Sequence, residues 1–315
     1  MPKPARAVVL RRVKAWVAGY DIFLAFLGLF ALASLLSRTF LTPINLLNVA
    51  RQVSILGIAA AGTTFVIIGA GIDMSIGAVI ALTSVVVALL QKVPILLVFL
   101  VVMLLGLLVG GINGTLVSRL GMDPFIVSFG MGGVAEGLAF TFSGGRPVFI
   151  EVPAYQVLGS GQVLGVPIPV WIFATVTVLC SLALSRTPFG VYVYSIGENP
   201  EAAFVAGINV RMIRMATYLI GGACAALSGF VLAGRMTTGD PGVGMGLTLD
   251  VITAVVVGGT QLEGGVGSIP RTLIGALMIG ILNNITNLLG IGIYFQMILK
   301  GVLIVAAVLL GRRRR

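Results

Sequence analysis

Histidine is the clearest absence from this chain of 315 residues. Without it, the sequence has neither the commonest general base nor the commonest metal ligand of proteins. Cysteine is nearly absent too: Cys180 and Cys224 lie inside apolar runs, without the spacing of a metal or redox site, so we expect both to be buried as small apolar side chains. The sequence also has no HExxH pattern and no nucleophile elbow. These absences leave no group of residues that supports catalysis.

Charge is scarce as well. Only 10% of the residues are charged, 58% are hydrophobic, and the mean hydropathy is +1.13. These values exclude a soluble globular protein and predict an all-α polytopic membrane protein. The net charge of +10 could suggest nucleic-acid binding, but basic residues crowd the first 14 residues and the last four. Basic ends beside apolar segments are typical of cytoplasmic flanks that face anionic lipid, so no nucleic-acid partner is predicted.

Ten apolar runs have about the length of membrane spans. They lie at 20–36, 53–70, 76–90, 93–117, 125–142, 169–184, 215–233, 249–260, 272–289 and 294–310. With the N-terminus in the cytoplasm, the inner segments hold 14 of the 20 Lys and Arg residues and the outer segments hold five, as the positive-inside rule requires. We therefore expect a basic cytoplasmic N-terminus (1–19), one transmembrane domain (20–310) and a basic cytoplasmic tail (311–315).

A compact polar segment, residues 197–207, separates the sixth and seventh predicted spans. Asn199 can cap a helix, Pro200 suits its first position, and Gly207 can end it two turns later. The sequence therefore predicts a short cytoplasmic helix at about 198–208. A helix of this length is marginal alone in water. We expect it to be supported by the helix bundle, by another subunit or by both, and to offer a place for docking.

Two glycine-rich breaks interrupt the predicted helices. The first, residues 69–77, contains Asp73 and Ser75, and the aspartate either caps the third span or lies in the solute path; the two roles are compatible. The second, residues 239–246, precedes Asp250 and holds too many glycines for a long helix. The later glycine run, 258–267, lacks the lysine and hydroxyl pair of a P-loop. Breaks in both halves of a transporter often mark its pathway.

Other polar residues lie within the apolar runs. Glu136 must face a partner or a wet cavity if it lies within the bilayer. Asn283 and Asn287 are one turn apart, together with Asn284, and either form interhelical hydrogen bonds or line a path for a hydroxylated solute. On the last span Lys300 shares a face with Gln296 and is expected to snorkel. The candidates for the translocation path are thus Asp73, Ser75, Glu136, Asp250, Asn283 and Asn287. Glycines 106, 110 and 114, and 133 and 137, recur every four residues and predict close helix packing.

Several of these segments resemble signatures of permease subunits in the ribose/xylose/galactose-type family of ABC importers. The matching stretches are 71–77 (GIDMSIG), 144–147 (GGRP), 197–207, 249–250 (LD) leading to 258–260 (GGT), and 264–268 (GGVGS). They occur in the same order as in that family and cover roughly residues 40–310. Each motif is modest alone, and the ordered set is specific.

The resemblance implies a permease of ten spans in the bacterial inner membrane, working as a pair of permease subunits and passing a ribose-like monosaccharide. It implies that a cytoplasmic ATPase subunit binds ATP and Mg, that an extracytoplasmic sugar-binding protein delivers the solute, and that this chain binds no cofactor and is not an enzyme. The short helix, here named the coupling helix, would fit a groove on the ATPase. Its docking residues would be Glu198, Asn199, Pro200, Glu201, Ala202, Ala203 and Gly207.

The sequence departs at one place from the general pattern of ABC importer permeases. Glu201, Ala202, Ala203 and Gly207 match the start of the general importer pattern, but the proline of its longer form is missing near 217–220. This weakens any analogy to maltose-type permeases.

The alternatives are an ABC permease for an autoinducer-type sugar derivative, a nucleoside or a branched-chain amino acid, and an ion-coupled secondary transporter. An ion-coupled secondary transporter would have more carboxylates within the membrane and would need no docking helix. A scaffold protein gives no reason for the clustered glycines.

Overall fold

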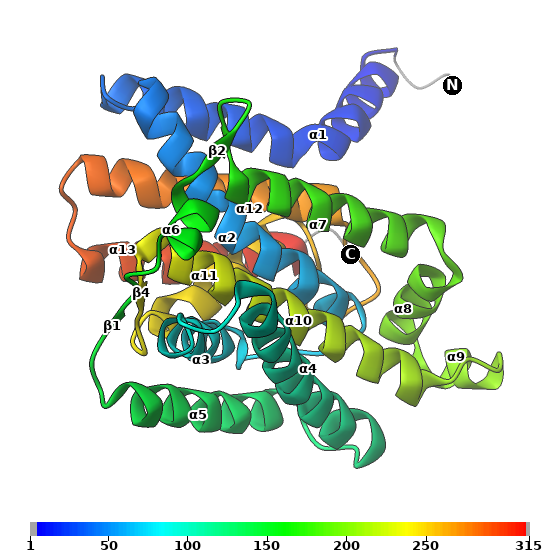
Figure 1. Ribbon diagram of the computed structural model, residues 1–315. Helices are drawn as coiled ribbons and strands as arrows, with labels where there is room; N and C mark the ends of the chain where they lie inside the picture. The colour runs from blue at the N-terminus through cyan, green and yellow to red at the C-terminus, as the bar shows by residue number, and fades with distance from the viewer. Residues whose placement is uncertain (1–4, 313–315) are drawn as a thin grey trace.

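The computed structural model of the chain describes residues 5–312, so the outermost residues of both basic termini lie outside it. The described part is mostly helical (Figure 1). Its helices are α1 (Ala5–Leu36), α2 (Pro43–Ile68), α3 (Ile76–Leu89), α4 (Ile95–Arg119), α5 (Pro124–Ser143), α6 (Pro153–Ser160), α7 (Ile168–Arg186), α8 (Pro188–Glu198), α9 (Pro200–Val205), α10 (Val210–Met236), α11 (Gly244–Val257), α12 (Ile269–Leu288) and α13 (Ile293–Arg312).

Each of the ten predicted spans coincides with one helix, and α6, α8 and α9 lie between them. Within residues 5–312, six helices are long and apolar enough to cross a membrane, namely α2, α4, α5, α7, α10 and α12. Helices α3 and α11 have 14 residues each, which at about 1.5 Å per residue is shorter than a bilayer core. The prediction of an all-α polytopic membrane protein is confirmed. The count of ten spans and the side of each terminus stay predictions.

Four strands of two residues each connect the helices. Strand β1 (Val148–Phe149) pairs antiparallel with β4 (Thr238–Gly239), and β2 (Gln162–Val163) pairs with β3 (Val166–Pro167). Three of them and α6 lie between α5 and α7, in a connection where the sequence predicts no membrane span. The β1–β4 pair links this connection to the second glycine-rich break, because β4 lies directly between α10 and α11.

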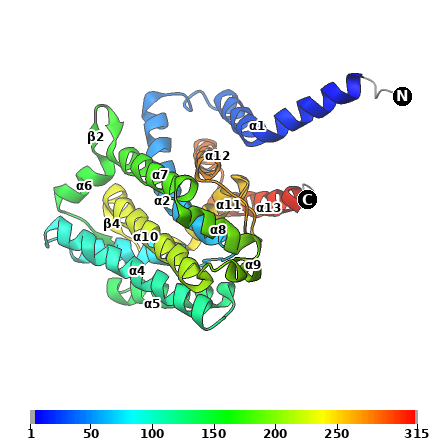
Figure 2. The same ribbon diagram turned by 90° about the vertical axis from the view of Figure 1, so that its right-hand side faces the viewer.

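The buried centre of the bundle is built around α2 and α10. Both helices are largely buried, whereas α4, α5 and α7 keep most of their apolar surface exposed. In Figures 1 and 2, α2 and α10 run through the middle of the molecule, with α4 and α5 on one side and α1 and α12 on the other. Such exposed apolar surface on long apolar helices is suited to contact with lipid or with another membrane subunit.

Glycines bring α4 and α10 into backbone contact. A Cβ atom on Gly106 would overlap the carbonyl oxygen of Gly222, and one on Gly110 would overlap that of Tyr218. The packing role predicted for the α4 glycines is therefore confirmed. The same prediction is wrong for Gly133 and Gly137, where an added Cβ would meet no atom within 4 Å in the described chain.

The physical reason for the difference lies in how α5 is oriented. Its buried face carries Ser128, Gly132 and Ala135 and packs against α3. Gly133 and Gly137 lie away from that face, and they are exposed. A four-residue spacing shows that small residues share a face and does not show whether that face is covered.

The two cysteines are free and buried, as expected for small apolar side chains.

Candidate translocation path and docking surface

Asp73 is buried in the break between α2 and α3. Its Oδ1 accepts the backbone N–H of Ser75 at 2.8 Å and the Ser75 hydroxyl at 2.6 Å. The side-chain amide of Asn113 on α4 donates to Ser75 Oγ at 3.0 Å and lies 3.5 Å from Asp73 Oδ1. Ser75 is the residue that precedes α3. Asp73 therefore fixes the turn before the helix, and the predicted cap on the first helical turn is not formed.

Two further helices hold the same break. On α5, the Ser128 hydroxyl accepts the N–H of Met74 at 2.9 Å and lies 3.3 Å from the carbonyl oxygen of Ile72. On α10, the Tyr218 hydroxyl donates to the Ile72 carbonyl at 3.1 Å. A Cβ on Gly71 would come within 2.8 Å of that hydroxyl, so glycine lets the tyrosine reach the backbone. The break is thus an ordered turn fixed by hydrogen bonds from three helices.

Asp250 forms the centre of a second polar cluster. The Nζ of Lys300 on α13 lies 2.7 Å from its Oδ1 and 3.0 Å from its Oδ2, and Asn283 Nδ2 on α12 donates to Oδ2 at 3.1 Å. The Lys300 side chain is only 15% exposed. The snorkelling predicted for Lys300 is therefore wrong. A carboxylate in an apolar bundle needs a counter-charge, and Asp250 draws the ammonium group inward.

The asparagines of α12 reach three different helices. Asn283 bonds Asp250 on α11, Asn284 exchanges two amide hydrogen bonds with Asn45 on α2, and Asn287 accepts from Gln296 on α13 at 2.9 Å. This confirms interhelical hydrogen bonding for all three amides. Asn287 is exposed, and the buried Oδ1 of Asn283 has no hydrogen-bond partner among the described residues.

Glu136 stands apart from both clusters. It is half-buried on α5, and within residues 5–312 it has no hydrogen-bond or ion-pair partner. The structure thus joins Asp73 with Ser75 and Asp250 with Asn283, with Asn287 one turn further on, and leaves Glu136 alone. The sequence interpretation missed Asn113, Ser128 and Tyr218 as partners of the first break. For Asn113 a signal existed, because it is an amide among apolar residues and packing glycines.

The coupling helix is present as α9, shorter than the predicted 198–208, and the predicted roles of its cap residues are confirmed. Asn199 Oδ1 accepts the N–H of Ala202 at 2.9 Å, Pro200 is the first helical residue, and Gly207 has a φ of +84°. Of the predicted docking residues, the buried one is Ala203, and the exposed ones are Glu198, Asn199, Pro200, Glu201, Ala202 and Gly207.

The surface of α9 also carries an apolar pair that the sequence interpretation overlooked. Phe204 is 72% exposed and Val205 is 86% exposed. Isolated large apolar side chains on a surface are ordinary, but an adjacent pair on a six-residue helix in a polar segment is suited to burial against a partner. The signal was visible in the sequence as an apolar pair within the polar segment.

Helix α8, which the sequence interpretation also missed, connects this surface to the bundle (Figure 2). Its signal was Thr187 followed by Pro188, since the threonine caps the helix by accepting the N–H of Gly190. At its other end, a Cβ on Gly197 would overlap the carbonyl oxygen of Ile68.

That carbonyl belongs to a three-way junction. The Ile68 carbonyl accepts the N–H of Gly265 at 2.9 Å. The end of α8, the end of α2 and the glycine loop 258–267 therefore meet main chain to main chain. We name this contact the backbone junction. It connects the segment that carries the coupling helix directly to the break that contains Asp73.

Comparison with known proteins places the chain among transport permeases. A family model described as the branched-chain amino acid transport system / permease component matches residues 45–308. The chain is 41% identical over 296 residues to the ribose import permease protein of Bacillus subtilis, with 92% of each chain covered. It is 39% identical over 308 residues to the ribose import permease protein of Escherichia coli, with 96% of each covered. It is 34% identical over 320 residues to the L-arabinose ABC transporter permease protein of Azospirillum brasilense, covering 100% of this chain and 94% of the relative. No solved structure matches the chain.

Proposed function

The chain belongs to this permease family, as a multi-pass membrane subunit of a ribose/xylose/galactose-type ABC importer, and we propose that the solute it passes is ribose or a closely related monosaccharide. The observation that carries the proposal is the identity with ribose import permeases along nearly the whole chain. The chain is a transport component, and the energy for import comes from ATP and Mg on a separate ATPase subunit.

The polar interior agrees with a neutral, hydroxyl-rich solute. Asp250 is matched by Lys300, so that pair presents no net charge. Most other buried polar side chains are hydroxyls and amides, which can exchange hydrogen bonds with sugar hydroxyl groups. The unsatisfied Oδ1 of Asn283 and the exposed amide of Asn287 lie one turn apart and are the groups best placed to do so.

Uptake by the assembled importer tests the solute. The chain would be reconstituted in liposomes with an ATPase subunit and a sugar-binding protein from the same organism, and uptake of labelled ribose measured with unlabelled arabinose, galactose or leucine as competitors. We expect ATP-dependent ribose uptake that pentoses inhibit more strongly than leucine. If the importer took up another solute but not ribose, the proposed substrate would be wrong. Uptake driven by an ion gradient without ATP would indicate a secondary transporter.

Arabinose is the second candidate, because the relative from Azospirillum brasilense is named for it. The competition series separates the two sugars directly.

The path assignment has its own test. Asn283→Leu with Asn287→Leu removes both amides, so we expect lower uptake with normal assembly of the importer. Thr175→Leu on α7 is the control, because the side chain is exposed and its hydroxyl bonds only within its own helix. Uptake equal to that of the control would remove these amides from the path. Asp73, Ser75, Glu136 and Asp250 remain path candidates that the same assay can rank.

For the topology, we infer ten spans with both termini in the cytoplasm, in the bacterial inner membrane. In support, ten helices coincide with the predicted runs, and basic residues gather on one set of loops. In a background of Cys180→Ala and Cys224→Ala, we expect a membrane-impermeant thiol reagent to label Arg38→Cys in whole cells. Arg186→Cys should be labelled only after the cells are opened. The reverse pattern would invert the orientation.

For the partners, we infer that α9 docks into the ATPase, that an extracytoplasmic sugar-binding protein delivers the solute, and that a second permease subunit completes the pore. The exposed Glu201, Phe204 and Val205 support the docking role. Glu201→Lys with Phe204→Ala should abolish co-purification of the ATPase, whereas the exposed control Glu151→Lys should retain it. Gly207→Val should act similarly by straining a left-handed residue. Complex formation by all variants would disprove the docking surface.

A further inference from the structure

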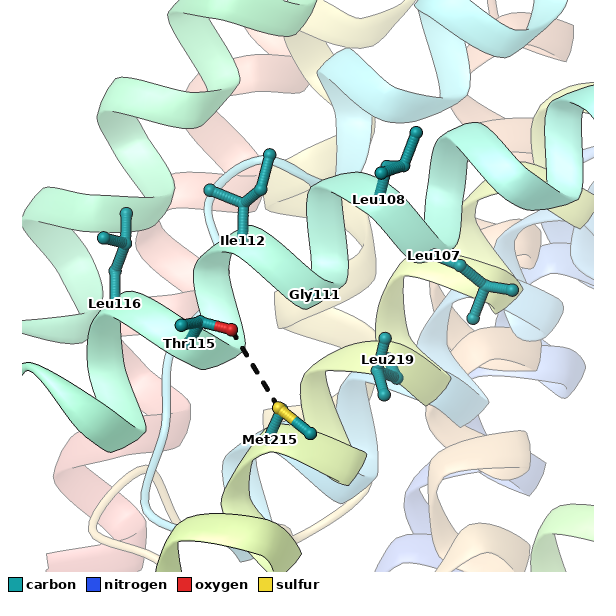
Figure 3. Close-up of a pocket in the computed structure, with 8 residues that line it drawn as sticks. All are labelled: Leu107, Leu108, Gly111, Ile112, Thr115, Leu116, Met215 and Leu219. Carbon is teal, nitrogen blue, oxygen red and sulfur yellow. Dashed lines mark hydrogen bonds between the residues drawn. The ribbon is translucent and has the colours of Figure 1, made fainter.

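An open apolar groove runs between α4 and α10 on the surface of the bundle. Its volume is about 400 Å³, and it is lined by Leu107, Leu108, Gly111, Ile112, Thr115, Leu116, Met215 and Leu219. Figure 3 shows residues from both helices along it, with Thr115 and Met215 pointing toward one another. Apart from the Thr115 hydroxyl, which lies 3.9 Å from the Met215 sulfur, the lining side chains are apolar.

The groove exists because glycines lie on two faces of α4. Gly110 and Gly114 press against α10; a Cβ on Gly114 would lie 3.1 Å from Met215 Cα. Gly111, one position further round, leaves space, since a Cβ there would meet only the tip of Leu219 at 3.5 Å. Both helices are apolar spans, and Leu108 and Ile112 are exposed beside the groove. Hydrocarbon is therefore what the groove meets in a bilayer.

One end of the groove leads to arginines. The helices are antiparallel, since Gly106 meets Gly222 and Gly114 meets Met215. Arg119 lies four residues beyond Thr115 on α4, and Arg211 lies four residues before Met215 on α10. Residues four apart share a helix face, so both arginines extend the lining of the groove at the same end.

These arginines have no carboxylate to pair with in the described part of the chain. Arg119 and Arg211 are exposed and form no ion pair there. Asp123, close by in the α4–α5 connection, accepts the N–H groups of Phe125 and Ile126 instead. The end of the groove thus carries two arginine side chains that form no ion pair within residues 5–312.

A buried polar atom beside Arg119 also has no hydrogen-bond partner among the described residues. It is the Oγ of Ser118, which lies three residues beyond Thr115 on α4. A buried hydroxyl without an acceptor costs free energy, and phosphate oxygens are strong acceptors for hydroxyl and guanidinium groups. An apolar groove that ends in unpaired arginines and an unsatisfied hydroxyl matches a molecule with an acyl chain and an anionic head.

We propose that the α4–α10 groove is a binding site for an anionic phospholipid, with one acyl chain in the groove and the phosphate group held by Arg119 and Arg211. Basic pockets at the ends of membrane helices attract anionic lipid head groups in this way. The site lies at the start of α10, which closely follows the coupling helix α9. It does not depend on which solute the chain passes.

The test uses the full-length chain in nanodiscs of phosphatidylcholine with a small fraction of phosphatidylglycerol of the same acyl chains. The lipid that stays bound after extraction in mild detergent is counted by native mass spectrometry. We expect one retained phosphatidylglycerol per chain in clear preference to phosphatidylcholine. Equal retention of both lipids by the unaltered chain would overturn the proposal.

Two pairs of variants separate the head group from the acyl chain. Arg119→Gln with Arg211→Gln should weaken phosphatidylglycerol binding about tenfold or more. Its control is Arg146→Gln with Arg186→Gln, which removes two exposed arginines that are on neither of the two helices lining the groove. Gly111→Leu should fill the groove and reduce retention of any lipid. Its control is Gly133→Leu, where an added side chain meets open space on α5.

Melting in pure phosphatidylcholine checks that each variant is folded. Variants that melt like their controls and retain less phosphatidylglycerol support the site. If both the arginine and the glycine variants retained as much phosphatidylglycerol as their controls, the site would be disproved. It would also be disproved if the controls lost as much phosphatidylglycerol as the variants.

Discussion

Asp73 and Asp250 are both buried carboxylates in a very apolar bundle, yet the chain stabilises them by different means. Asp250 has a cation, Lys300, at 2.7 Å and an amide, Asn283, at 3.1 Å. Asp73 has hydroxyl and N–H donors, with Ser75 contributing two and Asn113 a more distant third. Within residues 5–312, Asp73 forms no ion pair. The Asp250 carboxylate is thus stabilised by an opposite charge, and the Asp73 carboxylate by hydrogen-bond donors.

The difference corresponds to what each site joins. The Asp250 pair links α11 to α13 across 50 residues, so it fixes how two helices lie against each other. The Asp73 cluster fixes a turn, and its partners on α4, α5 and α10 hold that turn in place. A buried ion pair is sensitive to loss of either partner, because a lone charge is left behind. A set of hydrogen bonds is lost in smaller steps.

The largest effect should come from removing the cation. Lys300→Met leaves the Asp250 carboxylate buried without a counter-charge, and we expect it to lower the free energy of unfolding by about 3–5 kcal/mol. The measurement is reversible unfolding of the chain in detergent.

The matched control removes both charges. Asp250→Leu with Lys300→Met should recover most of the lost stability, because no uncompensated charge remains. If the double variant were as unstable as Lys300→Met alone, the pair would not be the cause.

Next in size is the effect of Asp73→Leu. It leaves the Ser75 N–H and hydroxyl without their acceptor, and at about 1–3 kcal/mol for an unsatisfied buried group we expect a loss of about 2–4 kcal/mol. Asp73→Asn keeps an acceptor oxygen and should cost clearly less. The same unfolding assay compares the two, and an equal loss would mean that the charge itself matters and the two aspartates are alike.

A smaller effect is expected for Asn283→Ala. It removes one hydrogen bond to a charged group while Lys300 stays in place, so a loss of about 1.5–3 kcal/mol follows. Asn284→Ala on the same helix is a comparison variant, because its partner Asn45 is neutral. We expect Asn283→Ala to be the more costly of the two when melting is followed by circular dichroism.

The smallest effect should be that of Ser75→Ala. The backbone N–H of residue 75 still reaches Asp73, so only the hydroxyl bond is lost, at about 1 kcal/mol. A loss as large as that of Lys300→Met would contradict the picture of a site stabilised in small steps.

The sequence predicted the elements better than their partners. Ten apolar runs marked ten helices, and Asn199, Pro200 and Gly207 marked α9, because spans and caps depend on residues close together in the chain. The pairing of Asp250 with Lys300, and of Ser75 with Asn113, joins residues 50 and 38 positions apart. Such contacts depend on how helices are arranged in space, which local patterns do not encode. The same reason explains why the exposure of Gly133 and Gly137 could not be predicted.

The backbone junction of Gly197, Ile68 and Gly265 has a mechanical consequence. A contact between side chains can accommodate a displacement of a few tenths of an ångström because the side-chain torsion angles can rotate. A contact between main-chain atoms has no such freedom. A displacement of the end of α8, which leads directly into α9, is therefore passed to the end of α2 with little loss at this contact.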